Sequence, residues 1–374
     1  MKTRLLLSLL LSAGILHAQT PVFTSGSDGY KSFRIPAIVR TPKGELLAFA
    51  EGRVGGAGDF GDIDLVLKRS SDDGKTWSSL EKIVDNGTLQ AGNPAPVIDE
   101  TDPAFPGGRL FLFYNTGNNH EGEVRKGKGL REVWVVTSAD GGRTWSVPEN
   151  ITAQVHRPKQ EPYSFPDDWR SYANTPGHAV QVPAGKYRGR IFVAANHSAG
   201  DPRPHFTDYR AHGYYSDDHG KTYHLAETVA FDGSNEATAA WLPDGGLLFN
   251  ARNQSGTPKA RIVARSRDGG ASWSSVQIDP SLPDPVCEGS LLNLRRRRGH
   301  ILAFCNAADT ARRDRLTLRL SKDGGISWTT GIVVDSGPRD FTAYSDLTEL
   351  DRRRIGVLYE RENYRQIVFK VVEL

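Results

Sequence analysis

The octapeptide Ser70-Ser71-Asp72-Asp73-Gly74-Lys75-Thr76-Trp77 returns, with variations, four more times along this chain of 374 residues. Its pattern is Ser-x-Asp-x-Gly-x-Thr-Trp, with Tyr for Trp in the third occurrence and Ser for Thr in the last two. The other four occurrences begin at Ser138, Ser216, Ser266 and Ser321. A unit that recurs along the whole sequence indicates a repeat architecture, in which each occurrence marks the same local structure.

The Asp and Gly of the octapeptide predict a hydrogen-bonded turn. The carboxylate can cap backbone N–H groups, and Gly accepts a positive φ without a steric penalty. Alternating apolar residues precede most occurrences, as in 64–68, 132–137 and 261–265, and another strand usually begins after them. Each octapeptide therefore predicts a hairpin turn whose aromatic residue anchors it to the core. The five carboxylates are expected to be structural caps, not acids or bases.

The intervals between the octapeptides leave room each time for a four-stranded antiparallel sheet. Such sheets bury their faces by packing radially on one another, which makes a β-propeller. The composition fits a large core, with 38% hydrophobic residues, 7 Trp, 12 Tyr and 15 Phe, and it excludes disorder and a coiled coil. Because no stretch reads as a linker, we expect one domain.

The first eighteen residues differ from the rest. Lys2 and Arg4 precede an apolar run from Leu5 to Leu11, and a small residue, Ala18, follows. This pattern predicts a signal peptide over residues 1–18 and a mature domain over 19–374, secreted or periplasmic. The alternative is a membrane anchor, but the apolar run is shorter than the roughly 18 to 20 residues that span a bilayer. We expect no membrane insertion of the mature chain.

The net charge gives no indication of a nucleic-acid partner, and the two cysteines leave open whether the domain has a disulfide bond. Without residues 1–18, 45 Lys and Arg stand against 44 Asp and Glu, so the net charge does not indicate a nucleic-acid partner. The basic clusters at 295–298 and 352–354 are expected to be solvated turns. Cys287 and Cys305 lie on neighbouring apolar runs and are either disulfide-bonded or two buried free thiols.

The octapeptides resemble the Asp-box repeat of the sialidases. The resemblance implies an all-β fold, a six-bladed β-propeller with antiparallel four-stranded blades, in which one blade has lost its box. Asp boxes also occur in propellers that bind proteins or have no enzymatic role. A non-catalytic propeller that binds glycans or proteins is therefore the alternative to an enzyme, and motifs outside the boxes must decide between them.

Three arginines stand in segments that resemble sialidase motifs. Arg34 lies in Phe33-Arg34-Ile35-Pro36, which resembles the motif that opens sialidase domains; Arg252 lies in Asn250-Ala251-Arg252-Asn253; and Arg315 lies ahead of the fifth box. The guanidinium fork makes paired, charge-assisted hydrogen bonds to a carboxylate that lysine cannot reproduce. The resemblance implies that the three arginines clamp the carboxylate of sialic acid. It also implies that Glu360 pairs with the first arginine.

The glycine-rich stretch from Glu51 to Asp62 resembles the loop that carries the acid/base aspartate of the family. The resemblance implies that Asp59 protonates the departing oxygen and that Arg53 contacts substrate. We prefer Asp59 to Asp62 and Asp64 because those two fall in the alternating run that becomes the next strand.

The nucleophile is expected to be a tyrosine. Sialic acid carries a carboxylate on its anomeric carbon, which would repel an attacking Asp or Glu, whereas a neutral phenol avoids the repulsion. Tyr344, in Ala343-Tyr344-Ser345-Asp346, and Glu236, in Asn235-Glu236-Ala237-Thr238, match the family's nucleophile and its base. A free tyrosine titrates at about 10, so it needs such a base near neutral pH.

Other residues give weaker signals. Asn93 matches a segment that lines the pocket in relatives, His178 and His197 are candidates for the pocket wall, and the stretches 117–131 and 163–176 are expected to be long rim loops. No His or Cys spacing predicts a metal site, and we expect no cofactor.

The resemblance thus implies an exo-α-sialidase that acts with retention on sialylated glycans, glycoproteins or glycolipids, as a monomer. A further alternative is a related hydrolase or trans-sialidase that acts on another 2-keto acid sugar.

Overall fold

The computed structural model describes residues 19–296 and 299–374. The expected signal peptide, residues 1–18, lies outside the described residues. The described part confirms the all-β prediction, because 25 strands account for nearly all of its regular structure. Its few helical turns are α1 (Glu121–Val124), α2 (Thr152–Val155) and the 3₁₀ turn η1 (Pro204–Phe206). Within these ranges no helix has the length and apolarity needed to cross a membrane.

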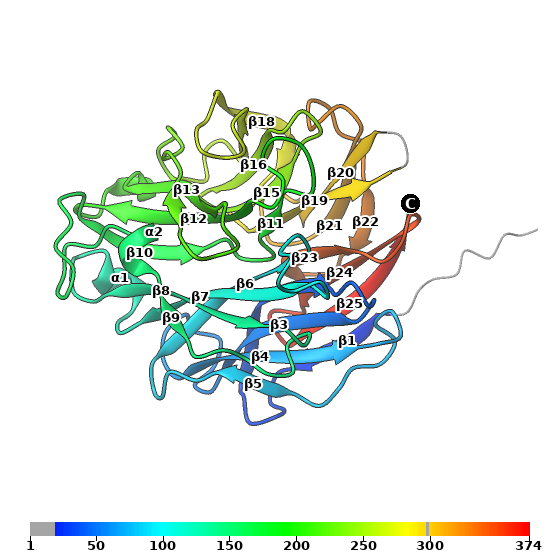
Figure 1. Cartoon of the computed structure of the whole chain (residues 1–374), viewed down its shortest axis with the longest axis horizontal. Helices are drawn as coiled ribbons and strands as arrows, with labels where there is room; N and C mark the ends of the chain where they lie inside the picture. The colour runs from blue at the N-terminus through cyan, green and yellow to red at the C-terminus, as the bar shows by residue number, and fades with distance from the viewer. Residues whose placement is uncertain (1–18, 297–298) are drawn as a thin grey trace, which may run out of the picture.

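The strands form five hydrogen-bonded sheets, which follow one another around the molecule in chain order (Figure 1). The first sheet in sequence contains β2 (Ser32–Arg40), β3 (Leu46–Arg53), β4 (Ile63–Ser70), β5 (Glu81–Val84), β6 (Gln90–Asp99), β7 (Arg109–Gly117), β8 (Arg131–Ser138) and β9 (Glu149–Asn150). The second contains β10 (Trp169–Asn174), β11 (Val180–Gln181), β12 (Ile191–Ala199), β13 (Tyr209–Ser216) and β14 (His224–Leu225). The third contains β15 (Ser234–Trp241), β16 (Leu247–Asn253), β17 (Ala260–Ser266) and β18 (Ser275–Pro283). The fourth contains β19 (Gly289–Arg295), β20 (His300–Ala307), β21 (Leu316–Ser321) and β22 (Ile332–Asp335).

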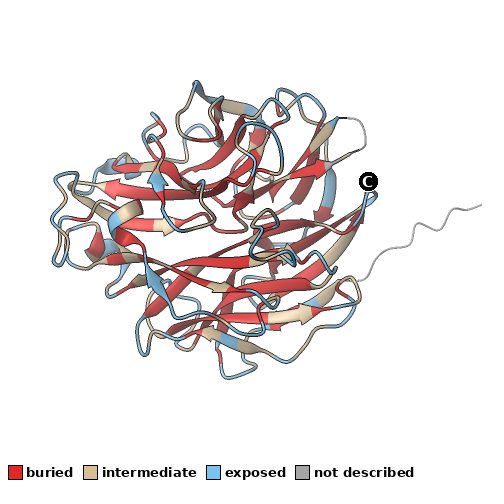
Figure 2. Ribbon diagram, viewed as in Figure 1, coloured by how far each residue is buried: buried red, intermediate tan, exposed pale blue. Residues whose placement is uncertain are grey.

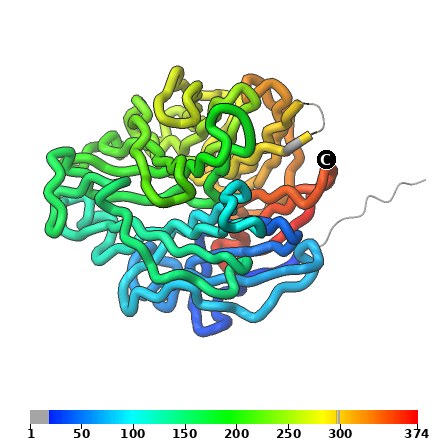
Figure 3. Tube along the Cα trace, in the orientation of Figure 1, coloured from blue at the N-terminus to red at the C-terminus, as the bar shows by residue number. Residues whose placement is uncertain are grey.

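The fifth sheet joins the two ends of the described chain. Its order is β1 (Thr20–Thr24), β25 (Gln366–Glu373), β24 (Arg354–Arg361) and β23 (Thr342–Glu349). Thr20 lies opposite Phe369 in the antiparallel pair of β1 and β25. The blue and red ends of the trace therefore run side by side (Figure 3). Pairing the first strand with the last closes the ring of sheets and leaves no gap between its two ends.

The prediction of six four-stranded blades is wrong. In the described residues, four sheets have the four or five strands of a blade, and the remaining sheet has eight strands. The eight-stranded sheet arises because β4 and β6 pair in parallel at Ile63 and Gln90, which joins two groups of strands that the boxes would assign to separate blades. Box spacing reports hairpin turns, and it carries no information about a hydrogen bond between neighbouring groups.

The five boxes form the predicted turns. In the first, the backbone N–H groups of Lys75 and Thr76 donate to one Asp72 oxygen at 3.1 and 3.0 Å, and the Thr76 hydroxyl donates to the other at 2.6 Å. Ser70 accepts from the Gly74 N–H at 2.9 Å. These hydrogen bonds, led by that from the Thr76 side chain, lower the pKa of Asp72 to about 2. The remaining four boxes repeat the contacts of the Ser and Asp side chains, so the carboxylates are caps.

The aromatic residue of a box packs against the preceding group of strands. Trp77 meets Phe369 of β25 edge to face with ring centroids 5.6 Å apart, and Tyr223 meets Phe113 of β7 at 5.7 Å. Edge-to-face aromatic pairs contribute beyond the area that they bury. The boxes therefore hold neighbouring groups of strands together. The strands themselves are largely buried, as the red ribbons in Figure 2 show.

Cys287 and Cys305 are two buried free thiols. Cys287 packs in a small cluster with Tyr344, whereas Cys305 belongs to a separate core cluster formed by residues of strands β19 to β25. Of the two alternatives that the sequence leaves open, the structure selects the unbridged pair.

Three buried histidines lie close together at the second sheet, His197 and His212 on its strands β12 and β13 and His156 on the connection before β10. His197 and His212 face each other through their Nδ1 atoms at 3.1 Å, and His197 stacks on Trp169 with ring centroids 3.5 Å apart. His156 packs on Tyr172 at 4.6 Å, and neither of its ring nitrogens has a hydrogen-bond partner among the described residues. Burial lowers the pKa of all three imidazoles, that of His212 to about 3.

We expect the free energy of unfolding to rise with pH between about 4.5 and 6.5. In this range the unfolded chain protonates the three histidines while the folded chain keeps them neutral, so the unfolded state binds more protons. Burial raises the pKa of Glu288, so this one group stays protonated in the folded chain and lowers the rise in stability with pH. Urea titrations across the range measure the slope. His156→Phe should lower that slope by about 1.4 kcal/mol per pH unit, and an unchanged slope would contradict the assignment.

Candidate active site

A polar pocket of about 340 Å³ opens where the inner strands of the sheets meet. The residues that line it come from distant parts of the chain, from β2 and β3 near the N-terminus to the turn after β24. Those predicted from sequence are Arg34, Arg53, Asp59, Asn93, Glu236, Arg252 and Tyr344. The ring of sheets thus brings together side chains from both ends of the described chain, Arg34 near its start and Tyr364 near its end.

Three arginines surround the side chain of Tyr344. Arg252 Nη1 donates to the Tyr344 hydroxyl at 2.9 Å. The guanidinium carbons of Arg34 and Arg313 each lie 5.4 Å from the centroid of the Tyr344 ring, and all three arginines line the pocket. Three guanidinium groups around one phenol form a site for an anion, and their planar forks suit a carboxylate.

The third arginine of this cluster is Arg313, whereas the sequence analysis predicts Arg315. Arg315 is exposed and does not line the pocket. Its φ is 56°, so the chain is not extended just before β21. Its backbone N–H donates at 2.7 Å to the buried carboxylate of Asp314. Arg313 donates instead to the Val286 carbonyl and the Tyr364 hydroxyl, both at 3.1 Å, which fixes its guanidinium at the pocket.

The Tyr344 hydroxyl is bound to a carboxylate as well as to an arginine. It donates to Glu236 Oε1 at 2.5 Å, while Glu236 Oε2 accepts from Arg252 at 2.6 Å. Burial raises the pKa of Tyr344 well above its ordinary value, Glu236 raises it further, and Arg252 and Arg313 counteract this. The phenol of the free protein is therefore neutral, with an acceptor for its proton in contact.

Glu360 and Tyr364 hold Arg34 from two sides. Glu360 is fully buried and accepts from Arg34 Nε at 2.6 Å; it also accepts the backbone N–H groups of Ile35 and Tyr344, at 3.0 and 3.2 Å. The centroid of the Tyr364 ring lies 3.8 Å from the Arg34 guanidinium carbon. Glu360 thus lies where the sequence predicts it, and Tyr364 is a pocket residue that the sequence analysis missed.

Asp59 lies at the tip of the loop between β3 and β4, with its side chain 78% exposed. Arg53 Nη1 donates to Asp59 Oδ1 at 2.8 Å, and Arg34 Nη1 lies 3.8 Å from the same oxygen. Desolvation raises the pKa of Asp59, but the charges of Arg53 and Arg34 outweigh it, so this pKa lies below its ordinary value. Asp62 and Asp64 do not line the pocket, and Asp64 is buried in β4.

Arg53 and Asn93 share one carboxylate. Glu51 Oε2 accepts from Arg53 at 2.9 Å through Nε and at 2.5 Å through Nη2, and Glu51 Oε1 accepts the Asn93 N–H at 2.8 Å. Asn93 has φ 55°, and the preceding Gly92 has no room for a side chain, because an added Cβ would lie 2.4 Å from Glu51. Glu51 therefore orients both pocket residues, a role that the sequence analysis did not assign.

Further pocket residues come from the two stretches expected to be rim loops. Glu121 and Arg131 line the pocket from the first stretch, and Ser171 and Tyr172 from the second. The second stretch is not a loop throughout, because residues 169–174 form β10. Glu121 accepts from Ser171 Oγ at 2.6 Å, and also from the Tyr209 hydroxyl.

Neither candidate histidine lines this pocket. His178 lines a separate cavity of about 460 Å³ and pairs with the buried carboxylate of Asp346, Nδ1 to Oδ1, at 2.6 Å. Asp346 also accepts from the Ile38 N–H and the Ser290 hydroxyl, both at 2.8 Å, so it ties three strands together. His197 belongs to the buried histidine cluster described above.

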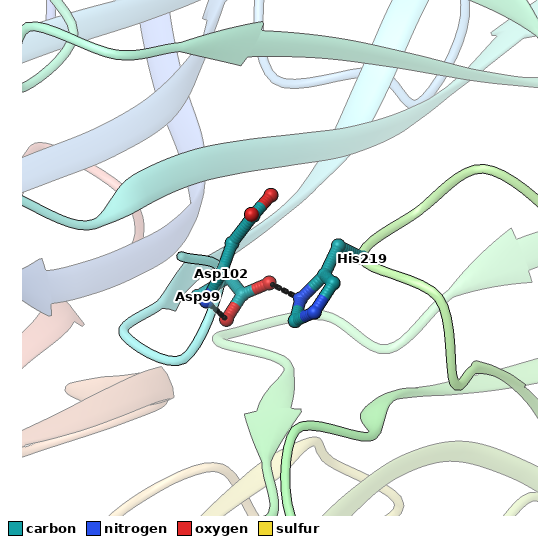
Figure 4. Close-up of side chains that lie close together, drawn as sticks. All are labelled: Asp99, Asp102 and His219. Carbon is teal, nitrogen blue, oxygen red and sulfur yellow. Dashed lines mark hydrogen bonds and ion pairs between the residues drawn. The ribbon is translucent and has the colours of Figure 1, made fainter. Parts of the chain in front are cut away.

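Away from the pocket, one group of side chains in the described residues has the arrangement of metal ligands: Asp99, Asp102 and His219, with ligand atoms within 4.8 Å of one another (Figure 4). Asp99 Oδ2 accepts from His219 Nδ1 at 2.7 Å. Asp99 Oδ1 accepts from the Thr101 N–H and hydroxyl, both at 2.8 Å, and from Gln181. Both oxygens are engaged with protein donors, so the group links the third box to the end of β6.

The chain resembles known proteins over most of its length. Residues 44–357 match the family described as BNR repeat-like domain. A sialidase of Micromonospora viridifaciens is 32% identical over 92% of this chain, which spans 52% of that protein. An exo-alpha-sialidase of Arthroderma benhamiae is 30% identical over 90% of this chain and 79% of that protein.

The solved structure of the Hadza microbial sialidase Hz136 has a TM-score of 0.80 to this chain, with 27% identity, and the match covers 95% of this chain and 68% of that one. Matches of this extent show the family of the whole described domain, not of one motif. The chain therefore belongs to the BNR-repeat sialidases, a family of glycoside hydrolases.

Proposed function

We propose that the chain is an exo-α-sialidase that hydrolyses terminal sialic acid from sialylated glycans, glycoproteins or glycolipids with retention of configuration. The observation that carries the proposal is the meeting of Arg34, Arg252 and Arg313 around the side chain of Tyr344, whose hydroxyl is already bonded to Glu236. A binding module could use the arginines, but it has no need of a phenol paired with a base.

The three guanidinium groups would bind the carboxylate of the sugar. Arg34 and Arg252 are more than nine-tenths buried, so their charge-assisted bonds to a carboxylate are weakly screened. Glu360 and Tyr364 keep Arg34 in place before substrate arrives. A carboxylate held there would set the adjacent anomeric carbon beside the Tyr344 hydroxyl.

Tyr344 is the proposed nucleophile. Its oxygen forms a bond to the anomeric carbon, its proton passes to Glu236, and the glycosidic bond breaks as Asp59 protonates the departing oxygen. In the second step, Asp59 takes a proton from water and the water oxygen bonds to the anomeric carbon. The bond between that carbon and the Tyr344 oxygen breaks, and Glu236 returns its proton to the departing phenolate. Two displacements at one carbon give retention.

Asp59 is the proposed acid and base. The sugar carboxylate would neutralise part of the arginine charge that lowers the pKa of Asp59, so we infer that bound substrate favours the protonated form.

We expect Asp59→Ala to reduce kcat/KM for an alkyl sialoside such as sialyllactose by roughly 10²- to 10⁴-fold. An aryl sialoside should lose much less, because a nitrophenolate leaves without a proton. Comparing the two substrates in parallel measures the difference. Equal losses on both would remove Asp59 from the acid role.

The direct test of function is release of free sialic acid from α2,3-, α2,6- and α2,8-linked substrates by purified, folded protein. Release from at least one linkage is expected. No release from any, with binding of a 2,3-unsaturated sialic acid analogue retained, would favour a glycan-binding propeller. Kdo and deaminated sialosides, and lactose as acceptor, test the related hydrolase and transferase reactions.

We also propose that the mature domain acts outside the cytoplasm. The support is the charged and apolar pattern of residues 1–18. Expression of the full chain in a bacterium, followed by fractionation and N-terminal sequencing, tests export. Recovery of uncleaved protein in the cytoplasm would contradict it.

A further inference from the structure

The loop that carries Asp59 makes few contacts with the rest of the protein. Added Cβ atoms at Gly55, Gly56, Gly58 and Gly61 would meet nothing within 4 Å. On the side of the arginines, Arg53 Nη1 donates to the Ala57 carbonyl at 2.6 Å and to Asp59 itself. A segment so poor in packing needs an anchor on its other side if Asp59 is to keep one position.

That anchor is a ring contact next to Asp59. The Phe60 ring stacks on the His120 imidazole, with centroids 5.5 Å apart and planes 7° from parallel. The two residues lie on different connections, Phe60 between β3 and β4 and His120 between β7 and β8. The contact therefore bridges two loops, each beside a residue that lines the pocket, Asp59 in one and Glu121 in the other.

His120 stands on a well-fixed segment. Its own N–H is bonded to the Asn119 side chain, and Asn119 Nδ2 donates to the Lys128 carbonyl at 2.6 Å. The Asn118 side chain accepts the Leu130 N–H at 2.7 Å. His120 also begins α1, whose first residue, Glu121, lines the pocket. The backbone of His120 is thus held within the connection that also carries the pocket residue Glu121.

We propose that His120 is a positioning residue for Asp59: its stack with Phe60 holds the glycine-rich loop so that the carboxylate stays over the pocket. The inference rests on the proposed function, because it concerns the acid of that reaction. His120 itself does not touch the reacting atoms, and stacking, not proton transfer, is its contribution.

The consequence is a leaving-group effect. A loop freed from His120 would sample positions in which Asp59 cannot reach the departing oxygen, which slows cleavage only where that oxygen needs a proton. Loss of one aromatic contact corresponds to about a 3- to 10-fold change. Sialyllactose should show it and a nitrophenyl sialoside should not.

The experiment compares wild type, His120→Ala, His120→Phe and His224→Ala, by kcat/KM on sialyllactose and on a nitrophenyl sialoside. His224 is also an exposed histidine that packs on an aromatic ring, that of Tyr215, and it does not line the pocket. His224→Ala is therefore the matched control. His120→Ala should lose activity on sialyllactose alone, His120→Phe should restore it, and His224→Ala should match wild type on both.

Equal losses of His120→Ala on both substrates, or no loss on either, would overturn the inference while leaving the sialidase function intact. Failure of His120→Phe to restore activity would also count against stacking. Inactivity of the wild type on both substrates would instead refute the proposed function, and the inference with it. Because His120 is exposed, we expect His120→Ala to melt within about 2 °C of the wild type.

Discussion

Tyr344→Phe is expected to lower kcat for a fluorogenic sialoside by roughly 10³-fold or more, which corresponds to about 4 kcal/mol of activation free energy. The change removes one oxygen and leaves the ion pair between Glu236 and Arg252 in place. The carboxylate site should therefore survive. Steady-state kinetics measure the loss, and calorimetric titration with a 2,3-unsaturated sialic acid analogue measures the retained binding.

A Tyr344→Phe variant with the wild-type rate would remove Tyr344 from the mechanism. A variant that neither turns over nor binds the analogue would indicate damage to the pocket, and in that case Glu236→Gln, which keeps the shape of the side chain, separates the loss of the base from the loss of the site. We expect Glu236→Gln to bind the analogue and to turn over slowly.

Arg313→Ala is expected to weaken binding of the same analogue by about 2–3 kcal/mol, or roughly 30- to 150-fold, because a charge-assisted bond to the carboxylate is lost. Arg315→Ala should change it by less than twofold, since Arg315 is exposed and away from the pocket. The two arginines are two residues apart, so the pair is an internal control. Calorimetry on both variants gives the comparison.

Arg313→Lys adds a second control, because lysine keeps the charge but cannot present two parallel donors to a carboxylate. We expect it to recover only part of the affinity. A large loss in Arg315→Ala with none in Arg313→Ala would show that the sequence-based choice of Arg315 describes the substrate complex better than the geometry of the free pocket.

The boxes predict the hairpin turns correctly, but they do not predict how many separate sheets the strands form. Each box holds its own hydrogen bonds within eight residues, so the Asp72 turn can be read from sequence. The number of separate sheets depends on contacts between groups. One parallel pair, Ile63 with Gln90, is enough to join two groups into an eight-stranded sheet, and nothing in either segment signals it.

In the pocket, too, some residues can be predicted from sequence and others cannot. Arg34, Glu236, Arg252 and Tyr344 lie on strands and stand in motifs that can be recognised in the sequence, although register shifts beside Arg34, Glu236 and Tyr344 interrupt the strand alternation there. Arg313 precedes a strand, in a stretch where Arg315 has a positive φ, so periodicity does not apply there.

Tyr364 follows two other residues of positive φ, Glu362 and Asn363, in the turn before β25. Such a turn is not encoded by any glycine, so neither its shape nor the approach of the Tyr364 ring to Arg34 can be predicted from residue types. Arg313 and Tyr364 thus combine irregular backbone with the lack of a motif of their own, whereas Glu51 lies on a regular strand and was missed because its role depends on contacts with Arg53 and Asn93.

The most direct test of the account is to trap the covalent intermediate. A 2,3-difluoro sialic acid slows the departure of the sugar from the enzyme, so incubation followed by intact-mass measurement and peptide mapping should find one sialosyl group on Tyr344. Tyr344→Phe should carry none. A sugar attached to another residue, or complete turnover of the fluorosugar by the Tyr344→Phe variant, would contradict the proposal that three arginines present the anomeric carbon to this phenol.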